Sequence, residues 1–177
     1  MKTKIWTALI LVYIIWGSTY LGIRFAVETI PPFFHAAVRF LISGALLFTW
    51  RRLAGDETPT RNQWKSAGIV GLLLLVGGNG LISFAEQTIP SGIAALLVAT
   101  IPLFLTLVES LRPGGIKPGR LQILGLLIGF GGVAVLIGPA EFLGASHQFD
   151  PSRVVIALAA AFLWTQGSIY NPSAALP

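Results

Sequence analysis

The stretch FFHAAVRFLISGALLF, residues 33–48, decides the fold class of this protein. Its one charged residue is Arg39, which has apolar neighbours on both sides and no acidic residue within four positions. A helix that is apolar on all sides is either buried in a large core or surrounded by lipid. The role of Arg39 therefore depends on the class of the whole chain.

The composition of the 177 residues indicates an integral membrane protein. Hydrophobic residues make up 54% and charged residues 11%, whereas a typical soluble domain has about 25% charged residues. The net charge of +5 does not indicate a nucleic-acid partner, because the basic residues form short clusters between apolar runs. The chain has no cysteine and only two, widely separated histidines. We therefore expect no metal and no cofactor, and membrane lipids as partners.

Six segments are long and apolar enough to cross a bilayer, which takes about 20 residues. Turn residues separate most of them. The predicted spans are Ile5–Ile23, Phe33–Trp50, Ser66–Phe84, Ser91–Leu111, Leu121–Gly138 and Val154–Tyr170. The sequence thus predicts an all-α integral membrane protein. The first span is too long, and lacks the cleavage pattern, for a removed secretory signal.

The distribution of lysine and arginine predicts the orientation. Nine of the 12 basic residues lie at alternate span ends, namely Lys2, Lys4, Arg51, Arg52, Arg61, Lys65, Arg112, Lys117 and Arg120. Short loops rich in basic residues stay in the cytoplasm. We therefore expect a multi-pass protein of the bacterial plasma membrane with a cytoplasmic N-terminus.

A short pattern occurs in both the first and the sixth span. YIIWGSTYLG and AFLWTQGSIY each contain a tryptophan, then Gly-Ser, one further residue and a tyrosine. Five spans separate the two starts, so the second copy would run through the membrane in the opposite direction. Inverted five-span units are typical of secondary transporters. Alternatively, the aromatic residues are anchors at the membrane interface.

The sequence also resembles a known family. The residues that carry the resemblance are IIWGSTYLGIRFAVETIPPFFHAAVRFLISG, GNGLISFAEQTIPSGIAALLVATIPLF and LGLLIGFGGVAVLIG. They are similar to the EamA family of the drug/metabolite transporter superfamily, especially its bacterial inner-membrane permease branch. The resemblance implies ten helices in two inverted five-helix repeats, and transport of small metabolites or drugs, often outward.

Against that family pattern, the chain ends just after the sixth span. We expect residues 1–138 to form the first five-helix repeat and residues 139–177 a loop and the first helix of an incomplete second repeat. The expected function is an efflux permease for small molecules, present as a truncated chain. The alternatives are a non-transporting membrane fragment and a subunit that works only as a homo-oligomer. No catalytic triad spacing and no carboxylate cluster indicates an enzyme.

Polar residues from several spans are predicted to share one depth in the outer third of the membrane. At 1.5 Å per residue, Arg39 lies roughly 9 Å below the outer end of its span. Together these residues suggest a polar vestibule or gate on the periplasmic side. The candidates for the substrate pathway are Trp16, Ser18, Thr19, Arg39, Asn79, Glu86, Thr100 and Pro102.

Two of these candidates are ionisable. Arg39 is expected to face the helix bundle and to pair with Glu86, with Glu28 or with an anionic substrate group, although its side chain could instead reach the near headgroups. Glu86 is the candidate for proton coupling or cation contact, because a carboxylate that loses water has a raised pKa. Alternatively, it is an ordinary loop acid, and Arg24 pairs with Glu28 one turn away.

The remaining candidates concern the backbone. Asn79 lies in a glycine-rich GGNG segment whose glycines are expected to allow close helix approach. The Gly125–Gly129 pair is expected to do the same. Pro102 is predicted to kink the fourth span and to free the carbonyl of Val98. The neighbouring Thr100 would satisfy that carbonyl or line a cavity.

Overall fold

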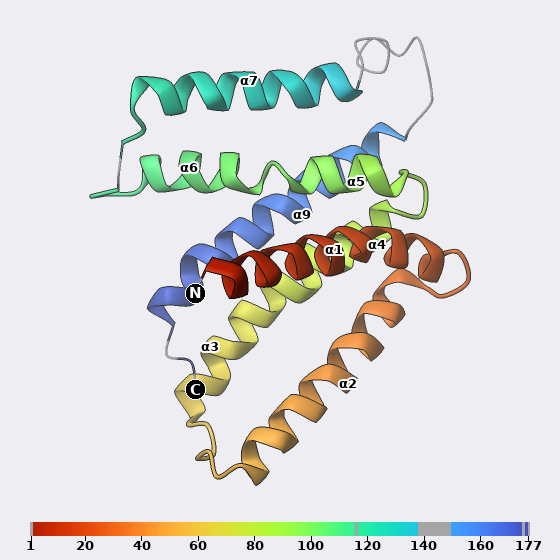
Figure 1. Ribbon diagram of the computed structural model, residues 1–177, viewed down its shortest axis with the longest axis vertical. Helices are drawn as coiled ribbons and strands as arrows, with labels where there is room; N and C mark the ends of the chain where they lie inside the picture. The colour runs from red at the N-terminus through yellow and green to blue at the C-terminus, as the bar shows by residue number, and fades with distance from the viewer. Residues whose placement is uncertain (1, 116, 138–149, 175, 177) are drawn as a thin grey trace.

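The computed structural model describes residues 2–115, 117–137, 150–174 and 176, and its described part contains helices and no strand. Figure 1 shows the arrangement. The elements are α1 (Lys2–Val27), α2 (Pro32–Leu53), α3 (Arg61–Gly71), the π-helix η1 (Leu72–Gly80), α4 (Leu81–Ala85), α5 (Ser91–Val98), α6 (Ile101–Leu111), α7 (Arg120–Ile137), α9 (Pro151–Tyr170) and the 3-10 helix η2 (Asn171–Ser173). The predicted all-α class is confirmed.

Five of these helical segments are long and apolar enough to cross a membrane. They are Lys4–Val27, Pro32–Leu53, Arg61–Ala85, Ser91–Leu111 and Pro151–Ser173. The predicted fifth span coincides with α7, whose apolar part over Arg120–Val135 is shorter than the other five. Its predicted end at Gly138, the expected boundary between residues 138 and 139 and His147 lie outside the described residues.

Helix α9 lies at the centre of the structure (Figure 1). It contacts α3, η1, α4, α5 and α6. Its buried face is built of small residues, including Ala157, Ala160, Ala161 and Gly167. A Cβ atom at Gly167 would lie 2.8 Å from Leu74 Cδ2. Small side chains therefore allow α9 to pack closely against its neighbours.

The glycines of the GGNG segment in the third span also lie at close contacts, as predicted. A Cβ atom at Gly77 would lie 2.9 Å from Leu163 Cδ1, and one at Gly78 would lie 2.5 Å from Trp164 Cε3. The Gly125–Gly129 prediction holds for Gly129 alone: a Cβ atom there would lie 2.9 Å from Leu103 Cδ1, whereas nothing lies within 4 Å of one at Gly125.

The fourth span is broken rather than simply kinked at Pro102. Helix α5 ends at Val98, and α6 begins at Ile101. The Thr100 hydroxyl donates a 2.6 Å hydrogen bond to the carbonyl of Leu97. The expectation that Thr100 satisfies the Val98 carbonyl is therefore wrong, because its side chain reaches back three residues to the end of the preceding turn.

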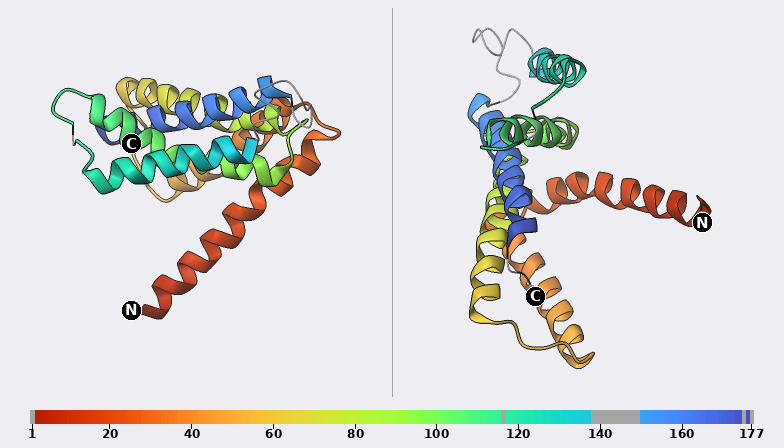
Figure 2. Two further views of the ribbon diagram at one scale, coloured as in Figure 1. Left: turned by 90° about the horizontal axis from the view of Figure 1, so that it is seen from above. Right: turned by 90° about the vertical axis from the view of Figure 1, so that its left-hand side faces the viewer.

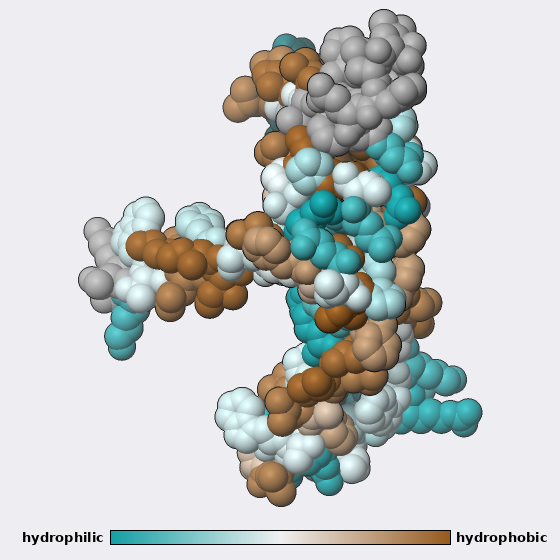
Figure 3. Space-filling model, turned by 90° about the vertical axis from the view of Figure 1, so that its right-hand side faces the viewer, coloured by the Kyte–Doolittle hydropathy of each residue, from teal (hydrophilic) through white to brown (hydrophobic). Residues whose placement is uncertain are grey.

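Helix α1 projects away from the other helices over its N-terminal part (Figure 2). Its residues 4–18 are all exposed, and Ile23 and Val27 are its buried residues within the described part. Figure 3 looks onto the end of the molecule where α1 meets α2, and it shows hydrophilic residues gathered between apolar surfaces. The apolar exposed residues are those expected to contact lipid or other helices.

Candidate functional site

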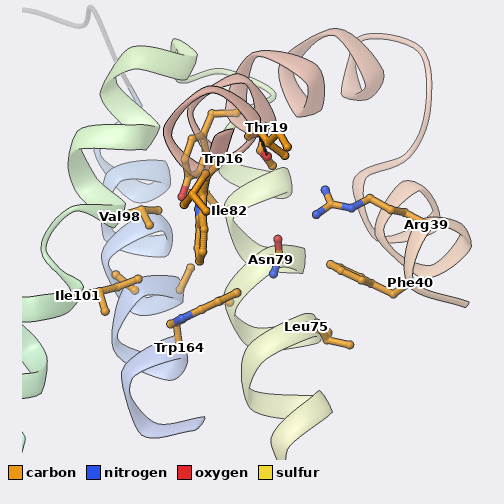
Figure 4. Close-up of a pocket in the computed structure, with 16 residues that line it drawn as sticks. Trp16, Thr19, Arg39, Phe40, Leu75, Asn79, Ile82, Val98, Ile101 and Trp164 are labelled. Carbon is orange, nitrogen blue, oxygen red and sulfur yellow. Dashed lines mark hydrogen bonds between the residues drawn. The ribbon is translucent and has the colours of Figure 1, made fainter. Parts of the chain in front are cut away.

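A cavity of about 370 Å³ lies between α1, α2, the third span, the α5–α6 junction and α9. The close-up in Figure 4 shows its lining. The lining residues are Val12, Ile15, Trp16, Thr19, Tyr20, Arg39, Phe40, Leu75, Gly78, Asn79, Ile82, Val98, Ile101, Ala160, Ala161 and Trp164. Most are apolar or aromatic, with a few polar groups among them, as is common in small-molecule sites.

Two tryptophans from different ends of the chain meet at this cavity. The rings of Trp16 and Trp164 pack edge to face, with centroids 6.4 Å apart. The indole ring of Trp164 packs against η1, because Gly78 has no side chain and leaves room for the edge of that ring. The repeated sequence pattern could have identified Trp164 as a site residue, but sequence reasoning assigned only Trp16 to the pathway.

Arg39 is the cation of the cavity. Its guanidinium points away from the α2 backbone into the cavity, toward Asn79 (Figure 4), and its Cζ atom lies 4.7 Å from the centroid of the Phe40 ring. No ion pair joins it to Glu28 or Glu86 within the described part of the chain. The expected pairing with either acid is therefore wrong, and the guanidinium is open to an anionic group.

Asn79 and Thr19 supply further polar groups to the cavity wall. Asn79 Nδ2 donates a 3.3 Å hydrogen bond to the carbonyl of Leu74, and the Thr19 hydroxyl donates one of 2.9 Å to the carbonyl of Ile15. Asn79 belongs to the π-helix η1. Short π-helical segments frequently mark functional sites, and no sequence signal had indicated this one.

Glu86 lies outside the cavity, in the α4–α5 turn formed by residues 86–90. Its side chain is fully buried, and neither carboxyl oxygen has a hydrogen-bond partner among the described residues. Burial raises the pKa of Glu86 to about 8, although the nearby Arg24 guanidinium lowers it. The alternative of an ordinary loop acid is therefore wrong, because such an acid would be solvated.

Arg24 holds this turn against the end of α1. Its Nη1 atom donates to the backbone carbonyls of Glu86 and Gln87, the second at 2.7 Å. The alternative in which Arg24 pairs with Glu28 is wrong, because α1 ends at Val27 and the guanidinium contacts the α4–α5 turn instead.

The structure brings together only some of the predicted pathway residues. Trp16, Thr19, Arg39 and Asn79 line the cavity, whereas Ser18, Glu86, Thr100 and Pro102 do not. The Ser18 hydroxyl donates to the Ile15 carbonyl at 3.0 Å, Thr100 is buried and Pro102 is exposed. Phe40 and Tyr20 line the cavity although they were not among the predicted residues.

Comparison with known proteins identifies the relatives of this chain. Residues 3–138 match the EamA-like transporter family. The chain is 43% identical over 171 residues to the "Uncharacterized inner membrane transporter YedA" of Escherichia coli strain K12, covering 96% of this chain and 54% of that protein. It is 26% identical to the "Uncharacterized transporter YoaV" of Bacillus subtilis, covering 95% and 57% of the two chains.

A third relative is "Protein PagO" of Salmonella typhimurium, which is 28% identical over 169 residues, covering 93% of this chain and 55% of that protein. The chain spans about half the length of these curated relatives. No solved structure matches it.

Proposed function

The chain belongs to the EamA-like transporter family, and from this membership we propose that it forms the substrate-binding part of a transporter for small metabolites or drugs. It is a multi-pass membrane protein, and its relatives include a transporter named for the inner membrane. The single observation that supports a binding role is a cavity with a mainly apolar wall that Arg39 also lines, without an ion pair to Arg39 among the described residues.

The cavity lining favours a substrate with an apolar or aromatic body and one anionic group. Trp16 and Trp164 provide aromatic surface, and the Arg39 guanidinium provides a cation without an acidic partner among the described residues. An arginine guanidinium binds a carboxylate or phosphate through charge-assisted hydrogen bonds, which are stronger than those between neutral groups. The Asn79 amide adds a polar group on the opposite wall.

The direction of transport is proposed to be outward, as the resemblance to efflux permeases implies. We propose a location in the bacterial inner membrane, as in the name of the Escherichia coli relative, and a cytoplasmic N-terminus, which the basic clusters support. If two copies must associate to form a working unit, cross-linking in membranes will show dimers, and activity will depend on their formation.

The test is accumulation of radiolabelled aromatic carboxylates, with benzylamine as a cationic contrast, in bacteria that express the chain. We expect lower accumulation of a carboxylate, and we expect Arg39→Gln to abolish the effect. The matched control is Arg61→Gln at the start of α3, outside the cavity lining. Carboxylate uptake and release that are both identical in cells with and without the chain would refute the proposed transport.

A further inference from the structure

The surroundings of the Glu86 side chain disfavour its ionised form. This side chain is fully buried, and both of its carboxyl oxygens lack a hydrogen-bond partner among the described residues. An ionised carboxylate without water or donors is strongly disfavoured. In this arrangement the group must carry a proton, or a nearby donor must move onto it.

Such a donor lies at the end of α1, against the same turn. Arg24 acts electrostatically on Glu86, but its Nη1 atom is hydrogen-bonded to the carbonyls of Glu86 and Gln87. A guanidinium that holds two backbone carbonyls needs only a side-chain rotation to donate to a carboxylate of the same residue. A charge-assisted bond to a carboxylate is roughly twice as strong as one between neutral groups.

Other charged or titratable groups lie on the helices packed against this turn, and of these Arg153 has polar partners of its own. Glu86 acts electrostatically on Tyr20 of α1. Arg153 of α9 donates to the Phe84 carbonyl at 2.8 Å and lies 3.8 Å from Asp150. On α2, His35 and Arg39 act on each other. Arg24 is therefore the cation best placed to form an ion pair with an ionised Glu86.

We propose, on the basis of the transport function above, that Glu86 is a proton-binding site and that Arg24 acts as a switch, which changes its hydrogen-bond partners when Glu86 loses its proton. With Glu86 protonated, Arg24 stays on the carbonyls of Glu86 and Gln87. When the carboxyl O–H bond breaks and the proton passes to water, the new carboxylate accepts a hydrogen bond from Arg24, which leaves at least one carbonyl.

The position of this contact on α1 gives the switch a route to the cavity. Helix α1 is buried only at Ile23 and Val27 within its described part, on either side of Arg24. The cavity-lining residues Trp16, Thr19 and Tyr20 lie on the same helix. A change of Arg24 partners would therefore shift the buried end of a helix whose N-terminal part projects away from the other helices (Figure 2).

The solution behaviour expected of Glu86 agrees with this role. Burial raises the pKa of its carboxyl to about 8. The group then holds its proton at neutral pH and releases it under mildly alkaline conditions. Proton exchange by an ordinary exposed glutamate occurs at much lower pH, since its pKa is about 4.3.

The proton site is tested by infrared titration of the full chain in lipid nanodiscs. We expect a protonated-carboxyl band that disappears with a midpoint near pH 8. Glu86→Gln should remove this band, whereas the matched control Glu28→Gln, at an exposed acid near the end of α1, should retain it. A band that is absent, or that persists in Glu86→Gln, would overturn the assignment.

The switch is tested by spin-label distances, which the absence of native cysteine makes simple. Labels on Leu21→Cys and Thr88→Cys, both exposed positions, report the separation of α1 from the α4–α5 turn. We expect the distance to change across the same midpoint, and to be independent of pH in both Glu86→Gln and Arg24→Gln. A distance that does not change with pH in the otherwise native chain would overturn the switch.

Both measurements are independent of transport. A pH-dependent distance in a chain that moves no substrate would support the switch while refuting the transport function. Transport by a chain whose label distance does not change with pH would support the transport function and overturn the switch. Arg24→Lys serves as a second variant, because a lysine retains the charge but cannot make the paired contacts of the guanidinium; we expect it to keep the titration and shift its midpoint.

Discussion

Trp16 on α1 and Trp164 on α9 pack edge to face at the cavity, with ring centroids 6.4 Å apart and an interplanar angle of 62°. These are the two tryptophans of the repeated Trp–Gly-Ser–Tyr pattern. Their contact joins the first described helix to the last long one. That α1 and α9 begin two inverted repeats stays a prediction, but their equivalent tryptophans meet in one site.

The first prediction concerns this aromatic pair. We expect Trp16→Ala and Trp164→Ala each to reduce carboxylate transport, because each removes aromatic surface from the cavity. A double-mutant cycle on thermal unfolding should give a coupling free energy of about 0.5–1.5 kcal/mol, as for other edge-to-face pairs. Trp6→Ala is the control, since Trp6 lies on the same helix and is exposed. Additive effects of the two substitutions would contradict a direct contact.

The second prediction concerns the glycine beneath Trp164. In Gly78→Ala the new Cβ atom would lie 2.5 Å from Trp164 Cε3, so the ring must shift. We expect a loss of about 1–3 kcal/mol in the free energy of unfolding, typical of overpacking, and altered Trp164 fluorescence. Gly71→Ala in the same span is the control, because nothing lies within 4 Å of its Cβ position. Equal unfolding temperatures for the two variants would argue against the contact.

The third prediction concerns the break between α5 and α6. Thr100→Val removes the hydroxyl that donates to the Leu97 carbonyl at 2.6 Å in a buried position. We expect a loss of about 0.5–1.5 kcal/mol in the free energy of unfolding. Thr106→Val removes a comparable 2.9 Å bond to the Pro102 carbonyl at a more exposed position, and its effect should be smaller. The reverse order would show that Thr100 does not stabilise the break.

The fourth prediction links pH to stability through Glu86. Its pKa is raised from 4.5 to about 8 in the folded chain, so between these pH values the unfolded chain binds fewer protons than the folded one. The free energy of unfolding should therefore fall as pH rises through this window. In Glu86→Gln the unfolding temperature should depend less on pH, and at pH 8 it should exceed that of the native chain. A native chain that gains stability over this window would contradict the burial of Glu86.

The fifth prediction concerns orientation. The α1–α2 connection and the α2–α3 connection lie at opposite ends of α2, and the basic cluster of Arg51 and Arg52 is at the second. Alkaline phosphatase fused after Thr29 should be active in the periplasm, whereas a fusion after Thr58 should be inactive. The converse pattern would place the N-terminus outside the cell and would reverse the proposed side of the Glu86 turn.

The sequence by itself determined the membrane class, the helical fold and the approximate spans. These properties depend on local composition, because about 20 consecutive apolar residues satisfy their own backbone hydrogen bonds as a helix in lipid. It also predicted close packing at the glycines of the GGNG segment, and it included Arg39 and Asn79 in one candidate pathway.

Only the tertiary structure decided which side chains share the cavity and which partner each charged group has. The partners depend on the rotation of each helix about its axis and on where it ends. Helix α1 ends before Glu28, so Arg24 reaches the α4–α5 turn instead. Helix packing around the α4–α5 turn removes Glu86 from water, whereas Arg39 on α2 stays open toward the cavity.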